Sequence, residues 1–209
     1  MIITIDGCDG VGKSTQVQLL KQYFEQSGKF DLVSFLHFPV YENASGNLIE
    51  TSLDDKYPSV FSPGDNFSLP LLFELNRRSV LQELLNAKNN SHIALVLDRY
   101  TCSGLSYAKP KLSEDEFKVL LSITSLVPEA DITFILDISP ITARVRTMHR
   151  KNNDSFEKNV KYQGQVRQAF LDLAQVYDWN VINVESKTRE QVHEEILRVF
   201  NSKTDTTRK

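Results

Sequence analysis

A glycine-rich stretch near the start of the chain constrains the fold more than any other feature. Gly7, Gly12, Lys13 and Ser14 fill every fixed position of the pattern G-x-x-x-x-G-K-[ST]. A β-branched apolar run precedes the glycines, and apolar side chains recur at helical spacing over residues 16–26 behind them. Strand, glycine turn and helix in this order predict an α/β fold that holds a polyphosphate at the turn.

The loop residues are assigned to a bound nucleotide. We expect Lys13 to reach the β- and γ-phosphates and the Ser14 hydroxyl to hold Mg²⁺, while backbone N–H groups of the turn surround the phosphates. The alternative interpretation is a glycine turn that binds nothing. The expected donor-binding residues in the loop are Gly7, Asp9, Gly10, Val11, Gly12, Lys13, Ser14 and Thr15.

Strand-like and helix-like segments alternate along the chain. The expected strands lie near residue 3 and at 31–38, 92–98, 131–138 and 180–183. The expected helices lie at 16–26, 69–87, 115–125, 141–149, 157–178 and 189–200. This alternation predicts a parallel sheet of five strands covered on both faces, in a single three-layer domain at residues 1–200. We expect the polar tail at 201–209 to be frayed.

Composition narrows the class of ligand. The 209-residue chain has a formal net charge of -3, which favours a small phosphorylated substrate and argues against a nucleic-acid partner. No apolar run is long enough to span a bilayer, and Met1 leads directly into the first strand, so we expect a cytoplasmic protein. Cys8 and Cys102 lack metal-ligand spacing and are expected to be reduced.

Ligands of parallel sheets gather at the carboxyl ends of the strands. Asp98 ends an apolar strand as a Walker-B carboxylate does, so Ser14 and Asp98 form the expected metal site. Arg99 follows it and presents a planar fork of donors that suits a phosphate. The alternative is that Asp98 and Arg99 only cap a helix and form an exposed ion pair.

A second candidate ligand contact lies on the helix expected at 69–87. Phe73 and Arg77 are four residues apart and share a helical face, an arrangement that suits a stacked base and an anion. The alternative places Phe73 in the core, with Arg77 and Arg78 in solvent. Residues 41–66 are expected to form a loop with one short helix.

Together these residues resemble the thymidylate kinases, a family of P-loop nucleoside monophosphate kinases, over nearly the whole chain. The resemblance implies ATP- and Mg²⁺-dependent phosphorylation of dTMP to dTDP for dTTP synthesis, a homodimer, and a short lid at about 141–158. The segments that carry it are IDGCDGVGKSTQ at 5–16, FP at 38–39, FELNRR at 73–78, DRYTCSGLSY at 98–107, LDIS at 136–139 and QVRQAFLDLA at 165–174.

The resemblance also implies roles for individual residues. Asp9 would contact the 3′-hydroxyl of the acceptor sugar, although it could instead close an Asx turn within the loop. Phe73 would stack on thymine, Arg77 would contact the base or phosphate, and Arg99 would bind the monophosphate. The other implied acceptor contacts are His37, Phe38, Ser103 at the base edge, Tyr107 where a ribose 2′-hydroxyl would sit, and Gln163, whose alternative is an exposed helical glutamine.

The chain departs from the family pattern in two places that bear on catalysis. His37 stands where members commonly have an arginine, and a histidine donates one hydrogen bond and is only partly charged at neutral pH. Gly10 stands where some members carry an arginine, so the lid must supply the catalytic charge.

The lid sequence offers three arginines for this charge. Arg146 and Arg150 are four residues apart on one helical face, as a clamp over phosphates requires, and Arg144 is assigned to the donor nucleotide. At least one of the three is expected to be a solvated helix end. The expected catalytic residues are Lys13, Asp9, Arg99, Arg146 and Arg150.

Two alternative functions stay open at this point. One is a related P-loop kinase with another nucleoside or nucleoside monophosphate as acceptor. Arg77 and Arg99 favour an acceptor that already carries a phosphate, because without an anion the two cations would sit unneutralised in a cleft. The other is a nucleotide-binding module that transfers no phosphate.

Overall fold

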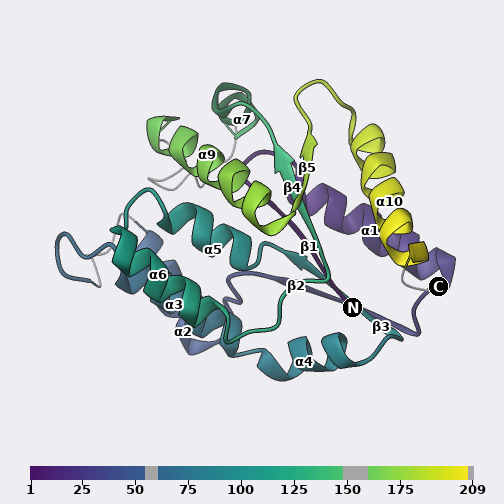
Figure 1. Cartoon of the computed structure of the whole chain (residues 1–209), viewed down its shortest axis with the longest axis horizontal. Helices are drawn as coiled ribbons and strands as arrows, with labels where there is room; N and C mark the ends of the chain where they lie inside the picture. The colour runs from purple at the N-terminus through teal and green to yellow at the C-terminus, as the bar shows by residue number, and fades with distance from the viewer. Residues whose placement is uncertain (55–60, 148–159, 207–209) are drawn as a thin grey trace.

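The computed structural model describes residues 1–54, 61–147 and 160–206. At its centre is a five-stranded sheet in the order β2-β3-β1-β4-β5, and all the neighbouring strands pair in parallel (Figure 1). The expected parallel α/β sheet is confirmed. The strands are β1 (Ile2–Gly7), β2 (Leu32–His37), β3 (Ile93–Asp98), β4 (Ile132–Asp137) and β5 (Asn180–Asn183).

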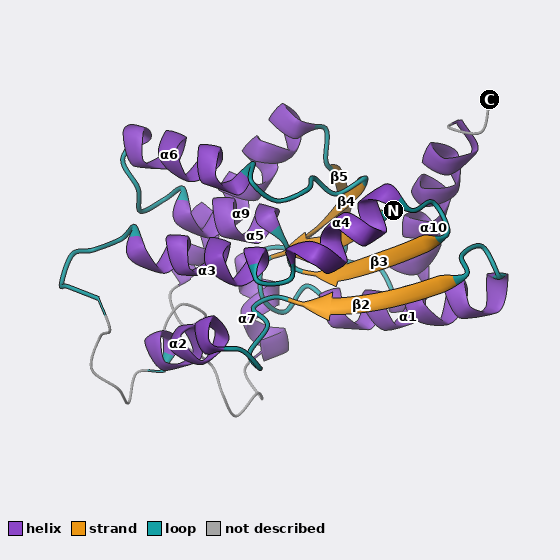
Figure 2. Ribbon diagram, turned by 90° about the horizontal axis from the view of Figure 1, so that it is seen from below, coloured by secondary structure: helices purple, strands orange, loops and turns teal. Residues whose placement is uncertain are grey.

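Helices cover both faces of this sheet. One face carries α1 and α10, and the other carries α4, α5 and α9 (Figure 1). The arrowheads of β2 and β3 point toward the end of the molecule where α2, α3 and α7 lie (Figure 2). The helices in the described part of the chain are α1 (Lys13–Ser27), α2 (Ala44–Leu53), α3 (Ser68–Arg78), α4 (Leu81–Asn89), α5 (Thr101–Ala108), α6 (Glu114–Thr124), α7 (Pro140–Thr147), α9 (Val160–Tyr177) and α10 (Arg189–Thr206).

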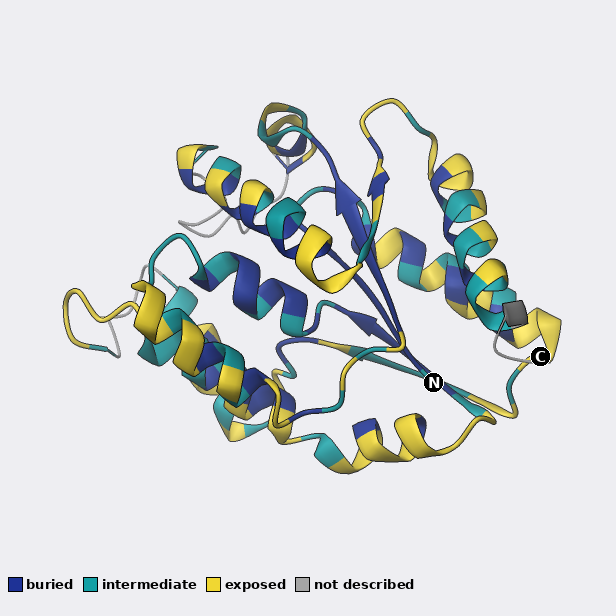
Figure 3. Cartoon of the chain, in the orientation of Figure 1, coloured by how far each residue is buried: buried dark blue, intermediate teal, exposed yellow. Residues whose placement is uncertain are grey.

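The core follows from the apolar character of the strands. Ile3 and Ile5 of β1 are fully buried and belong to one cluster with Phe24 of α1, Phe170 of α9 and Phe200 of α10. Figure 3 shows the central strands β1, β3 and β4 and the inward faces of these helices as buried, and the outer helix faces as exposed. Because both faces of the sheet are covered, polar ligands are left with the edge where the strands end.

Two sequence expectations about the helices are corrected. The helix expected at 69–87 is two helices, because α3 ends at Arg78 and Val80 leaves the helical conformation before α4 begins at Leu81. The tail at 201–209 was expected to be frayed, but α10 continues to Thr206. Lys29 supports this extension, since its Nζ donates to Asn201 Oδ1 at 2.6 Å.

Other boundaries lie close to the expected ones. The short helix expected within 41–66 is α2, and α5, which follows Asp98-Arg99-Tyr100, was missed by the helical pattern. Of the lid expected at about 141–158, the structure describes only α7, and Arg150 lies outside the described residues.

Candidate active site

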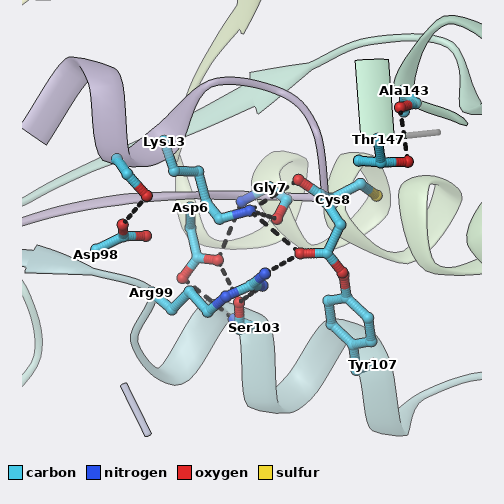
Figure 4. A network of polar contacts seen from close by, with 12 residues as sticks. Asp6, Gly7, Cys8, Lys13, Asp98, Arg99, Ser103, Tyr107, Ala143 and Thr147 are labelled. Carbon is cyan, nitrogen blue, oxygen red and sulfur yellow. Dashed lines mark hydrogen bonds and ion pairs between the residues drawn. The ribbon is translucent and has the colours of Figure 1, made fainter. Parts of the chain in front are cut away.

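The glycine-rich loop lies between β1 and α1, at the centre of Figure 4. A Cβ on Gly7, whose φ is 131°, would lie 2.4 Å from the Leu136 carbonyl oxygen, so only glycine lets the end of β1 approach β4 this closely. A Cβ on Gly10 would lie 2.8 Å from the Ala143 carbonyl oxygen. The loop is therefore packed between β4 and the first helix of the lid.

Lys13 begins α1, and its side chain folds back over the loop. Its Nζ donates to the carbonyl oxygens of Gly7 at 3.1 Å and Cys8 at 2.8 Å, and lies 3.8 Å from Asp9 Oδ1. Burial, together with the positive charge of Arg99, lowers the pKa of Lys13. Two cations held this close together favour the binding of an anion between them.

The two residues of the expected metal site lie at the start of α1 and at the end of β3. Ser14 Oγ donates to Asp98 Oδ2 at 2.7 Å, while Asp98 Oδ1 is buried and has no hydrogen-bond partner. Within residues 1–54, 61–147 and 160–206 there is no cluster of three or more carboxylate, histidine or cysteine ligands. Mg²⁺ fits this pair nevertheless, because it keeps waters and phosphate oxygens and needs only one or two protein groups.

His37 contacts this pair. Its Nδ1 lies 3.6 Å from Asp98 Oδ2, so in this conformation His37 faces the expected metal site. Burial alone would raise the pKa of Asp98, but hydrogen bonds from His37 and Ser14 and the charge of Lys13 lower it. Asp98 is therefore a carboxylate at neutral pH, as a metal-associated group must be.

Arg99 and Tyr107 both contact the loop residue Asp9, and Figure 4 shows these two side chains next to the loop. The Arg99 guanidinium donates to Asp9 Oδ1, the Tyr107 hydroxyl donates to Asp9 Oδ2 at 2.8 Å, and the guanidinium lies 5.9 Å from the centre of the Tyr107 ring. Burial alone would raise the pKa of Asp9, yet the charges of Arg99 and Lys13 and the Tyr107 hydrogen bond hold it well below its ordinary value. The loop carboxylate thus lies between Lys13 and the two side chains that follow β3 and line α5.

Sequence patterns missed Asp6, which lies under this group of residues. Its fully buried carboxylate accepts hydrogen bonds from the backbone N–H groups of Gly7, Tyr100 and Ser103 and from the Ser103 hydroxyl. Burial raises the pKa of Asp6, against the effect of the Ser103 hydrogen bond and the charge of Arg99. Asp6 joins the loop to the turn that carries Arg99. The signal was an aspartate ending a buried apolar strand, the same signal that identified Asp98.

Comparison with known proteins decides the family. The sequence profile described as thymidylate kinase matches residues 5–196. The chain belongs to the thymidylate kinase family. The family and the phosphotransferase class expected from the sequence are confirmed. Within the described ranges, no helix has both the length and the apolar character needed to cross a membrane.

Relatives and a solved structure agree with this assignment. The chain is 31% identical to the thymidylate kinase of Danio rerio over 199 residues, covering 93% of this chain and 87% of that one. It is 30% identical to a probable thymidylate kinase of Methanocaldococcus jannaschii over 200 residues, covering 94% of each. A solved structure of thymidylate kinase from Candida albicans is similar with a TM-score of 0.72 at 25% identity, covering 97% of this chain and 92% of that one.

Arg77 lies buried near the end of α3, and its implied contact with the base or phosphate stays a prediction. Its guanidinium is 2% exposed, donates to both carboxylate oxygens of Glu74, and reaches the Tyr100 carbonyl from Nη1 at 3.3 Å. Arg99 is likewise paired, with Asp9. Both arginines are thus neutralised without a phosphorylated acceptor, and the expectation that they would otherwise lack a counter-charge is wrong. Sequence patterns did not point to Glu74, although its i, i+3 spacing to Arg77 is a usual signal for a helical ion pair.

One further acceptor assignment is corrected, and two others stay predictions. Phe38 is 1% exposed and packs its ring against Tyr100 with centroids 5.7 Å apart, so it supports the site from the core and presents no surface to a nucleotide. The Ser103 hydroxyl donates to Asp6 and receives a 3.4 Å hydrogen bond from Arg99, so a contact with a base edge stays a prediction. Phe73 is partly buried on α3, and its stacking role also stays a prediction.

The two lid arginines that the structure describes, Arg144 and Arg146, have different surroundings. Arg144 lines a pocket with Cys8, Asp9 and Gln163, whereas Arg146 donates to the Val184 carbonyl beyond the end of β5 at 3.4 Å. Gln163 is 8% exposed, which corrects its alternative assignment as an exposed helical glutamine. A pocket residue on α9, close to the loop carboxylate, remains a candidate for the acceptor site.

Proposed function

We propose that this thymidylate kinase family member transfers the γ-phosphoryl group of ATP to dTMP, with Mg²⁺ on the donor, and releases dTDP and ADP. The observation that carries the proposal is the position of Asp9, which lies 3.8 Å from Lys13 Nζ of the phosphate loop and also accepts hydrogen bonds from Arg99 and Tyr107. Figure 4 shows Lys13, Arg99 and Tyr107 gathered at this point. Protein groups suited to the phosphates of the donor therefore lie next to protein groups suited to the sugar phosphate of the acceptor, as transfer between two nucleotides requires. The names of the relatives support dTMP as the acceptor.

The donor side is built from the loop and the Ser14–Asp98 pair. Lys13 would leave its carbonyl partners for phosphate oxygens, which carry full negative charge. Ser14 and Asp98 would hold Mg²⁺, which neutralises charge on the phosphate oxygens when bound. The remaining donor contacts we assign are the backbone of Gly7, Gly10, Val11, Gly12 and Thr15 and the side chain of Arg144.

The acceptor side uses the three residues beside the loop. Asp9 would accept a hydrogen bond from the sugar 3′-hydroxyl, and Arg99 would turn part of its fork from Asp9 to the acceptor phosphate. The ring of Tyr107 would occupy the position of a ribose 2′-hydroxyl and so select deoxynucleotides by exclusion. Phe73 would stack on the base.

Arg146 and Arg150 remain our candidates for the catalytic charge of the lid. In the described part of the lid, Arg146 is held on the Val184 carbonyl, away from the loop. Closing the lid would have to release this contact before Arg146 could reach transferring phosphates. The variants Arg146→Ala and Arg150→Ala, measured separately, identify the working residue as the one whose loss lowers kcat more.

The acceptor assignment is tested by a coupled ADP-release assay with Mg-ATP and a panel of dTMP, dUMP, dCMP, dGMP, UMP and thymidine. We expect dTMP to give the highest kcat/KM. Turnover of thymidine alone would move the protein to the nucleoside kinases. ATP binding without turnover of any acceptor would make it a nucleotide-binding module. The panel is broad because the Candida albicans enzyme is described as having broad substrate specificity.

The donor assignment is tested with Lys13→Ala. Turnover of the preferred acceptor should be nearly abolished, because the chain then lacks the cation that meets the transferred phosphate. Circular dichroism should match the parent protein. Normal turnover in a folded Lys13→Ala protein would remove the phosphate-loop assignment.

We also propose a homodimer. Large apolar side chains of α3 and of the α6 region are exposed, namely Leu75 at 60%, Val119 at 49% and Leu126 at 57%. The two helices contact one another, so these side chains offer one apolar face of the kind that partner subunits cover. Sedimentation at micromolar concentration tests this: a dimer that Leu75→Glu converts to monomer supports the proposal, and a monomeric parent protein contradicts it.

We place the protein in the cytoplasm and in dTTP synthesis. Cys8 and Cys102 are both free and buried, which is the usual state of cysteines in a reducing compartment. The product dTDP is one phosphorylation step from dTTP. Fractionation of source cells with an antibody to the chain tests the location.

A further inference from the structure

The turn that carries Arg99 has an unusual backbone. Arg99 has φ 68°, in the left-handed region that residues with a β-carbon rarely adopt. This conformation directs the guanidinium back across the loop to Asp9. A conformation of this kind persists only where neighbouring groups hold it in place.

Tyr100, the next residue, is held through both of its backbone polar groups. Its N–H donates to Asp6 Oδ2 at 2.8 Å, and its carbonyl accepts from Arg77 Nη1 at 3.3 Å. The two partners come from β1 and α3, on opposite sides of the turn. Tyr100 itself is fully buried, so the turn cannot shift without disturbing the core.

Glu74 determines where Arg77 points. Its two carboxylate oxygens accept from Nε and Nη2 of Arg77, which leaves Nη1 for the Tyr100 carbonyl. The pair is buried at 2% and 4% exposure and fits against α5 at Gly104, where a Cβ would lie 2.2 Å from Arg77 Nη2. Three of the five N–H groups of Arg77 are committed to these contacts, so the direction of its guanidinium is fixed.

We propose that Glu74 is a positioning residue for Arg99: it fixes Arg77, Arg77 holds the Tyr100 carbonyl, and the clamped turn aims Arg99 at the acceptor phosphate. The acceptor role of Arg99 rests on the proposed function, whereas the aiming of Arg99 does not. Replacing Glu74 with a neutral residue leaves the buried Arg77 cation without a counter-charge, so we expect Arg77 to move toward solvent and to release the Tyr100 carbonyl.

The first test is structural and needs no substrate. A crystal structure of Glu74→Gln should show Arg77 displaced from the Tyr100 carbonyl and Arg99 outside the left-handed region. Arg99 unchanged beside Asp9 would overturn the proposal. Arg77→Lys gives a second route, because one ammonium group cannot hold both Glu74 and Tyr100 in this geometry, and it serves if Glu74→Gln does not fold.

The second test is a double-mutant cycle on dTMP binding, measured by calorimetry with Glu74→Gln, Arg99→Ala and the double variant. We expect Glu74→Gln to weaken binding by roughly tenfold to a hundredfold, as misplaced binding groups do. When Arg99 is already replaced by alanine, Glu74→Gln should weaken dTMP binding by less than about a further twofold. Equal weakening in both backgrounds would show that Glu74 acts without Arg99.

Controls separate this proposal from the proposed function. Glu83→Gln, at an exposed position on α4, should leave dTMP binding and the crystal structure of the turn unchanged. If the parent protein binds a different acceptor, the cycle is run with that acceptor and the crystallographic test is unaffected. A parent protein that binds no acceptor contradicts the proposed function, and the structure of Glu74→Gln still decides whether Glu74 aims Arg99.

Discussion

Two arginine–carboxylate pairs lie on either side of the turn at Tyr100, and they differ chiefly in burial. In the Arg99–Asp9 pair the side chains are 20% and 18% exposed, and in the Arg77–Glu74 pair they are 2% and 4% exposed. Arg99 also faces Lys13 and Tyr107, which belong to the loop and the rim of the site. Arg77 faces only groups of the protein interior.

The difference in burial bears on how easily each arginine can exchange its carboxylate for a ligand. A partly exposed fork can exchange a carboxylate for a phosphate, since both accept paired hydrogen bonds and water can fill the gap. A buried fork that lost its carboxylate would be a charge in a medium of low dielectric. The sequence suggests a ligand contact for both arginines, and burial separates them.

Arg77→Ala should have the largest effect on folding. It leaves the Glu74 carboxylate buried without a partner, so the free energy of unfolding should fall by about 3–5 kcal/mol. Urea denaturation measures this change. Arg78→Ala is the matched control, because Arg78 is the exposed neighbour on the same helix, and it should change stability by less than about 0.5 kcal/mol. Equal losses in the two variants would contradict the burial argument.

Arg99→Ala should show the opposite pattern. The value of kcat/KM for dTMP should fall by roughly 10²–10³-fold, as it does when a preorganised donor to developing charge is removed. The free energy of unfolding should change by less than about 1 kcal/mol, because the pair is partly solvated. Steady-state kinetics and urea denaturation on one preparation test both statements. A large loss of stability in Arg99→Ala with unchanged kcat/KM would show that Arg99 serves the fold and not the substrate.

The sequence predicts the parts of the site whose determinants are local. The loop from Gly7 to Ser14 and the carboxylate at Asp98 are each identified by a few neighbouring residues. The break between α3 and α4 was missed because no glycine or proline stands between residues 71 and 89 to mark it.

The parts that were missed depend on contacts between distant residues. Asp6 meets Tyr100 and Ser103, which are more than 90 positions away along the chain, and no spacing pattern reports such a meeting. The extension of α10 depends on Lys29, 172 positions from Asn201. Glu74 and Arg77 are near neighbours, but the sequence could not tell that their pair is buried.

The partly exposed Arg99–Asp9 pair should also affect how the free energy of unfolding depends on pH. Because the folded pKa of Asp9 lies well below its ordinary value of 3.8, the pair stabilises the fold at higher pH and this contribution is lost as pH falls below about 4. The stability of the parent protein minus that of Asp9→Asn should therefore be constant from about pH 7 to 5 and shrink below it. Urea denaturation at several pH values gives the difference, and growth of the difference at low pH would contradict the assignment.

Tyr107 should produce the smallest and most selective effect. Its hydroxyl donates to Asp9, and a hydrogen bond to a charged group contributes about 1.5 kcal/mol, so Tyr107→Phe should lower kcat/KM for dTMP by roughly tenfold. The ring remains, so the preference for dUMP over UMP should persist in Tyr107→Phe and weaken in Tyr107→Ala. Loss of that preference in Tyr107→Phe would assign deoxynucleotide selection to the hydroxyl. The Tyr107 hydroxyl, together with the partly exposed pair of Asp9 and Arg99, would then be the group that distinguishes a deoxyribose from a ribose.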